Sequence, residues 1–155
     1  MKNLLAAALF AALAPAAMAA EINVTYAPEF SEKLADDYGE REGVYLSERV
    51  RADLERALAK AGADVARIEV TILDAKPSRP TFKQGGDEPG LDMHRSVSVG
   101  GMKLSAVTYD AAGKASEPFE YRWFETDITQ AGLTTWHDAR RASSRFAARY
   151  AKTVD

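Results

Sequence analysis

Two histidines are the side chains of this sequence best suited to acid–base or metal chemistry near neutral pH. His94 has Asp92 and Arg95 beside it, and His137 is followed by Asp138. A metal site needs three or four converging nitrogen, sulfur or oxygen ligands, and nothing in the spacing brings such a set together. A site shared by both histidines would require the segment around His94 to fold over the segment around His137. We therefore expect two unrelated, solvent-facing histidines, no metal and no other cofactor.

Patterns that mark catalytic nucleophiles are missing from the chain. It contains no cysteine, no Gly-x-Ser-x-Gly and no Ser-x-x-Lys. Ser143 and Ser144 lie inside a predicted helix, where a hydroxyl normally bonds the backbone or water. The pairs Gly85-Gly86 and Gly100-Gly101 precede no predicted helix, so the N–H groups that bind phosphate are missing. We predict no catalytic residues and favour a protein that is not an enzyme.

Cations gather on one side of the last predicted helix. Residues 136–152 contain five cations and one anion, and Arg141, Arg145 and Arg149 fall opposite the apolar face. Such a stripe can bind anionic lipid, nucleic acid or an acidic protein surface. It is also typical of a solvated face, and it can pair internally with the acidic segment 29–42. We keep these three arginines as candidate binding residues.

A second candidate surface is the segment 76–95, which holds three prolines and three glycines and is predicted to be a long loop. Loops of this length are uncommon in compact domains unless they have a function. Phe82, Leu91 and Met93 can anchor it against a sheet. The alternative is an Ω-like or mobile loop without a binding role. The candidate binding residues here are Arg79, Phe82, Asp92, His94 and Arg95.

The elements that must position these residues follow from hydrophobic periodicity. Alternating apolar residues predict four strands, at 21–26, 68–72, 96–109 and 119–124, the third interrupted at Gly100-Gly101. Apolar residues at helical spacing predict two helices, at 43–61 and 136–152, the second capped by Thr135. Segment 29–42 is interpreted as a polar, exposed connector.

The order β-α-β-loop-β-β-α predicts an α+β fold, a two-layer sandwich. In it a four-stranded, mostly antiparallel sheet carries both helices on one face. On the first helix, Leu54 lies at the centre of an apolar arc of about 120°. Arg49 and Asp53 occupy the opposite, polar side, where their spacing of four residues allows them to pair.

The first twenty residues predict export. Lys2 is followed by an apolar run over 4–14, Pro15 and the triplet Ala17-Met18-Ala19. These are the three parts of a cleavable secretory signal peptide, and the run is shorter than the roughly 20 residues that span a bilayer. We assign residues 1–19 to the signal peptide and 20–155 to one domain, which therefore works in the periplasm without a transmembrane segment.

Composition limits the partners of that domain. Removing 19 of the 155 residues leaves 136 and changes the net charge from −3 to −4, because Lys2 is the one charge removed. A net negative charge argues against a global role in binding nucleic acid.

Three short segments carry a resemblance to known proteins. The stretch Val24-Thr25-Tyr26-Ala27-Pro28-Glu29-Phe30, and a Leu73-Asp74 turn combined with Trp136-His137-Asp138-Ala139-Arg140-Arg141, resemble small uncharacterised bacterial exported domains. Such domains have no established catalytic residues to carry over. We expect a non-enzymatic binding or envelope-accessory domain, whose partner is an envelope protein or an anionic surface. The alternative is a small hydrolase or ligand-binding enzyme with its site in the 76–95 loop.

The export hypothesis predicts the N-terminus of the protein isolated from its host. Small residues precede the bonds before Ala20 and Glu21, so the purified protein should begin at one of these two residues. Intact-mass measurement checks this, and retention of Met1 would contradict it.

Overall fold

Four strands form the sheet of this computed structural model, which describes residues 20–154; the predicted signal peptide lies outside them. The strands are β1 (Glu21–Tyr26), β2 (Arg67–Lys76), β3 (Gly101–Tyr109) and β4 (Phe119–Phe124), and they lie in this order across the sheet. β1 pairs with β2 in parallel, whereas β2–β3 and β3–β4 are antiparallel. The sheet is therefore mixed rather than mostly antiparallel.

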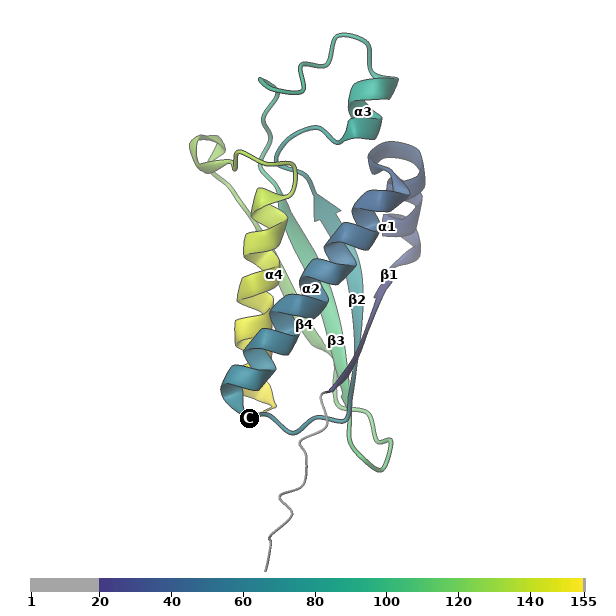
Figure 1. Ribbon diagram of the computed structural model, residues 1–155, viewed down its shortest axis with the longest axis vertical. Helices are drawn as coiled ribbons and strands as arrows, with labels where there is room; N and C mark the ends of the chain where they lie inside the picture. Colours follow the sequence, from purple (N-terminus) through teal and green to yellow (C-terminus); the bar gives the residue numbers. More distant parts are fainter. Residues whose placement is uncertain (1–19, 155) are drawn as a thin grey trace, which may run out of the picture.

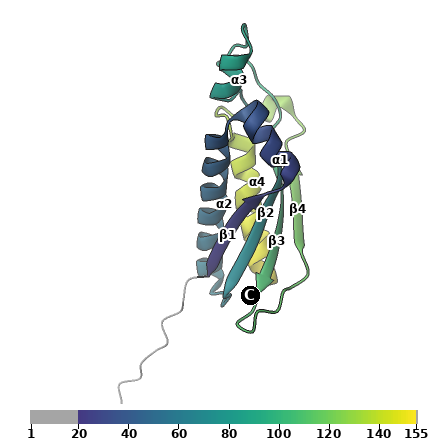
Figure 2. The ribbon, with the colours of Figure 1, turned by 90° about the vertical axis from the view of Figure 1, so that its right-hand side faces the viewer.

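Two long helices, α2 (Glu40–Ala61) and α4 (His137–Tyr150), pack against the same face of this sheet and against each other (Figure 2). The alternation of the strands turns Ile68, Val70 and Ile72 toward the helices, where they are buried with Leu54 and Phe146. This arrangement confirms the α+β sandwich. No helix within residues 20–154 combines the length and the apolar character needed to cross a bilayer.

The acidic segment 29–42 is not an exposed connector. It forms α1 (Pro28–Lys33) and a π-helical turn, η1 (Leu34–Tyr38), before α2 begins at Glu40, three residues earlier than expected. Phe30 and Leu34 are buried in the core. These two apolar residues are four positions apart, so they lie on one side of the helical segment and pack into the core. In the sequence this helical spacing is hard to recognise, because most of the residues around it are charged.

The prediction that Asp53 lies on the polar side of its helix is wrong. Its side chain is buried between α2 and α4, and 3% of its surface is exposed. Its carboxylate accepts hydrogen bonds from the hydroxyls of Ser143 (2.8 Å) and Ser144 (3.0 Å). Arg49 and Arg56 pair with it at 3.0 and 2.9 Å. The Arg49–Asp53 pair is confirmed, whereas the expectation that both serines bond backbone or water is wrong. A buried charge needs such a set of donors, so the polar stripe belongs partly to the helix interface.

Gly100-Gly101 interrupts the third predicted strand, as expected, and β3 begins at Gly101. A Cβ atom at Gly101 would lie 2.4 Å from the Cα of Phe124 on the neighbouring strand, so this close approach requires glycine. A tight turn follows β3, with Asp110 N–H donating to the carbonyl of Lys114. Local turn chemistry therefore fixes where β3 starts and ends.

The position of Leu54 in the core generates a stability prediction. Leu54 is fully buried between α2 and the sheet, so Leu54→Ala should lower the free energy of unfolding by about 2–5 kcal/mol. The control is Val44→Ala in the same helix, where Val44 is exposed and a change within about 0.5 kcal/mol is expected. Urea denaturation checks both variants, and equal losses would contradict the packing of α2.

Candidate functional site

Two segments that are distant in sequence meet at one end of the sheet (Figure 1). One joins β2 to β3 and contains α3 (Phe82–Asp87); the other joins β4 to α4 and contains a short 3₁₀ turn, η2 (Ile128–Gln130). We call this end the tip. The α3 helix was expected to be irregular loop, although Thr81 and Gln84 form a reciprocal capping box at its start. That spacing is the signal that the sequence interpretation missed.

A buried carboxylate ties the tip to α4. The Oδ2 atom of Asp138 accepts hydrogen bonds from the hydroxyl of Ser78 (2.8 Å) and the N–H of Gly100 (3.1 Å). Asp138 thus holds both ends of the β2–β3 segment. The predicted helix cap, Thr135, instead donates its hydroxyl to the carbonyl of Pro80, and the residue before α4, Trp136, makes no side-chain cap.

Arg79 joins the two walls of the tip. Its Nη1 donates to the carbonyl of His94 (2.6 Å) in one segment, and its Nε donates to the carbonyl of Gly132 (3.2 Å) in the other. Gly132 packs so closely on α4 that an added Cβ would lie 2.0 Å from the Cβ of His137. The guanidinium of Arg79 is therefore positioned by neutral carbonyls at the base of the tip.

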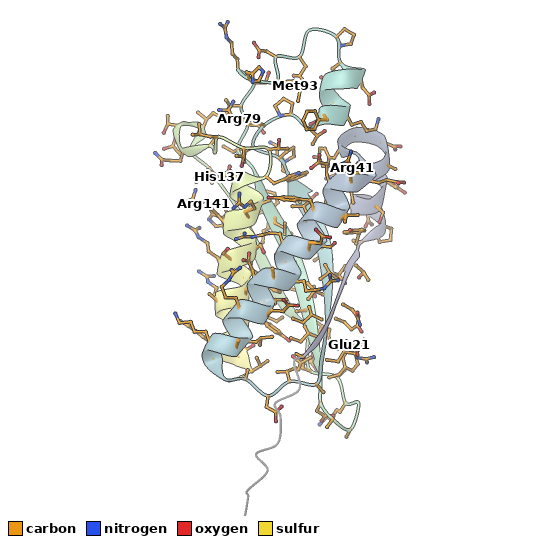
Figure 3. All side chains as sticks on the ribbon, in the orientation of Figure 1. Glu21, Arg41, Arg79, Met93, His137 and Arg141 are labelled. Carbon is orange, nitrogen blue, oxygen red and sulfur yellow. The ribbon has the colours of Figure 1, made fainter. Side chains whose placement is uncertain are left out.

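Between these walls lies an open groove of about 810 Å³, in the region where Figure 3 labels Arg79 and Met93. Its two most exposed apolar side chains are Phe82 (88% exposed) and Leu133 (80%), one from each segment. The expectation that Phe82 anchors the loop on the sheet is wrong, because Phe82 is the first residue of α3, a helix without buried residues. The groove is lined by Arg79, Pro80, Phe82, Gly85, Met93, His94, Leu133, Thr134 and Thr135.

Asp92 and Arg95, the other predicted loop residues, do not line the groove. The Asp92 carboxylate accepts the N–H groups of Arg95 and His94, both at 2.9 Å, and these bonds lower the pKa of Asp92. Arg95 lies 3.8 Å from Asp92 and is almost fully exposed. The pair shapes a turn, so the structure brings together Arg79, Phe82 and His94 of the five candidates.

The three candidate arginines of α4 stack on aromatic rings of β4. The guanidinium carbons of Arg145 and Arg141 lie 4.3 and 5.0 Å from the ring centre of Trp123, and that of Arg149 lies 5.3 Å from Tyr121. Cations within about 6 Å of a ring centre are attracted to its face. One part of the predicted stripe therefore covers the edge of the sheet.

Arg141 pairs with Glu125 at 3.0 Å and with Asp138 at 3.7 Å, and neither carboxylate belongs to the acidic segment 29–42. The pKa of Glu125 is lowered first by the N–H groups of Thr126 and Asp127 and then by Arg141.

A second open pocket, of about 410 Å³, lies beside these arginines and is lined by residues of α2 and α4. The sequence interpretation did not connect Arg49, Arg140 or His137 with Arg141 and Arg145, which the fold brings together here. The two histidines line different pockets, and residues 20–154 contain no group of three or more histidine, aspartate or glutamate side chains that could hold a metal.

The contacts of Asp138 generate a prediction on how the tip is held. Asp138→Asn removes the charge and places an amide donor at Oδ1, a buried atom without a hydrogen-bond partner among residues 20–154. We expect a loss of about 1–3 kcal/mol in the free energy of unfolding and shifted amide NMR signals at Ser78 and Gly100. Asp64→Asn, at an exposed residue without such contacts, is the control. An unchanged stability of the Asp138 variant would rule out this anchor.

Comparison of the chain with known proteins gives no relative. No protein-family model matches the chain, and neither curated proteins nor solved structures give a significant match. What the two pockets can do is therefore inferred from their own residues.

Proposed function

We propose that the protein is exported to the periplasm and works there as a non-enzymatic binding domain. Its binding surface is the tip groove, and its partner is an envelope protein that presents an apolar side chain next to a carboxylate. The signal-peptide pattern of residues 1–19 supports export. The observation that carries the binding site is the pair Phe82 and Leu133, exposed on opposite walls of one groove.

Large apolar side chains that are exposed together mark interaction surfaces, because each one costs hydration free energy until a partner covers it. Phe82 and Leu133 come from segments separated by about fifty residues, yet both are held at the groove by the contacts of Arg79 and Asp138. In protein interfaces a few residues contribute most of the affinity, and a large side chain that a pocket of the partner encloses is a suitable anchor.

The charge of the groove supports an acidic group on the partner. Arg79 bonds two carbonyls, and no carboxylate lies among the lining residues. Because carbonyls are neutral, these bonds leave the positive charge of the guanidinium uncompensated. Its remaining N–H groups can bind a carboxylate. An anionic membrane surface fits the groove less well, because it would not use the concave space between the two walls.

A hydrolase site in the same loop is the rival proposal. It would need a hydroxyl nucleophile within hydrogen-bond reach of a base. In the groove, the Thr135 hydroxyl is bonded to the Pro80 carbonyl, and the contacts of His94 are made by its backbone. The arrangement of the lining residues therefore favours binding over nucleophilic chemistry.

Site-specific cross-linking in the native periplasm tests the proposal. A photo-reactive phenylalanine analogue at position 82 should form a discrete cross-link to another protein, and adding Leu133→Asp should remove most of it. The same analogue at position 44, an exposed apolar site on α2 outside the groove lining, should give no such product. Cross-links that are equal from both positions, or unaffected by Leu133→Asp, would contradict the groove as the binding surface.

A further inference from the structure

The pocket between α2 and α4 is lined by four arginines. Arg49 of α2 contributes one wall, and the remaining lining residues come from α4: His137, Arg140, Arg141, Ser144 and Arg145. No carboxylate is part of the lining. Figure 3 labels His137 and Arg141, which lie close together near the start of α4.

Only some of these cations are compensated within residues 20–154. Arg49 pairs with Asp53, and Arg141 pairs with Glu125 and lies 3.7 Å from Asp138. Arg140 and Arg145 form no salt bridge with any described residue. The Nε atom of Arg140 is also buried without a hydrogen-bond partner there. The buried Nε atom is closed to a ligand, but the two guanidinium groups that have no carboxylate partner among these residues line one pocket with two further arginines. Such a set suits an anion.

Three of the four guanidinium groups, those of Arg49, Arg141 and Arg145, are held in place by contacts within the fold. Stacking on Trp123 fixes Arg145 and Arg141. Arg49 donates from Nη2 to the Ser144 hydroxyl at 3.3 Å, while its Nε remains on the buried carboxylate of Asp53. Positioned guanidinium forks match the geometry of oxyanions, and little side-chain freedom is left to lose on binding.

We propose that this pocket is a binding site for a phosphate or sulfate group carried by a larger organic molecule. The volume of about 410 Å³ falls in the range of small-molecule sites and exceeds what one tetrahedral oxyanion fills. Arg140 and Arg145 contact the oxyanion, and the remaining space accommodates the body of the ligand. This site is separate from the tip groove and does not depend on the function proposed for it.

Titration of the purified protein with glycerol 3-phosphate, at an ionic strength held constant with sodium chloride, tests the site. Amide NMR signals of residues 137–145 should shift and saturate. Arg145→Gln and Arg140→Gln should each weaken the affinity about tenfold or more, as expected for the loss of a charge-assisted hydrogen bond. The control is Arg122→Gln, an exposed arginine of β4 outside the pocket lining, which should leave the affinity unchanged.

Three outcomes would overturn the site: no saturable shift, a shift that chloride reproduces, or an equal loss in the Arg122 variant. Arg145→Lys keeps the positive charge but removes the planar guanidinium, so we expect it to weaken the affinity less than Arg145→Gln does. This variant keeps the test available if a glutamine variant does not fold. Sedimentation with phosphatidylglycerol vesicles, compared with phosphatidylcholine vesicles, separates the sources of the phosphate. Co-sedimentation that requires Arg145 indicates a lipid headgroup, whereas shifts with glycerol 3-phosphate alone indicate a soluble phosphate ester.

Discussion

The hydrogen bonds of Asp138 determine where both candidate surfaces lie. This carboxylate is fully buried; Ser78 and Gly100 donate to its Oδ2 atom, and the guanidinium of Arg141 lies 3.7 Å from its Oδ1 atom. These two donors are the ends of the excursion that carries α3, and the acceptor sits in the first turn of α4. Movement of the excursion relative to α4 would leave a charged oxygen without donors. The tip groove on one side and the arginine pocket on the other are therefore built on a common, fixed joint.

A second buried carboxylate, that of Asp53, joins two other elements in the same way. Asp53 on α2 accepts hydrogen bonds from Ser143 and Ser144 of α4, and it also forms an ion pair with Arg49. The consequence reaches the pocket, because Arg49 is turned toward Ser144 by the bonds that satisfy Asp53. Both surfaces thus rest on polar contacts inside an otherwise apolar core.

These two carboxylates also explain what the sequence could and could not predict. The four strands and the break at Gly100-Gly101 were predictable, because they depend on alternation and on glycines close in sequence. The burial of Asp53 and Asp138 was not, since each depends on donors 38 to 91 residues away. A charged residue on a polar helix stripe has the same local pattern whether it meets water or another helix. Of the site, the candidate residues Arg79, Phe82 and His94 were predictable, whereas Leu133 and Arg140 were not.

The arginine stripe of α4 shows how one charge pattern is divided between two roles. Arg141, Arg145 and Arg149 follow one another at intervals of four residues, so they run along the line where α4 meets β4. There their guanidinium groups cover Trp123 and Tyr121 at the exposed edge of the sheet. Arg140 is rotated by about 100° from Arg141, toward α2, and has no aromatic or acidic partner among the described residues. Arg145 has both roles, because its guanidinium stacks on Trp123 of β4 and its side chain also lines the pocket. The stripe therefore covers the rings of Trp123 and Tyr121 on β4, and only Arg140 and Arg145 of its arginines also line the pocket without a salt bridge to a described residue.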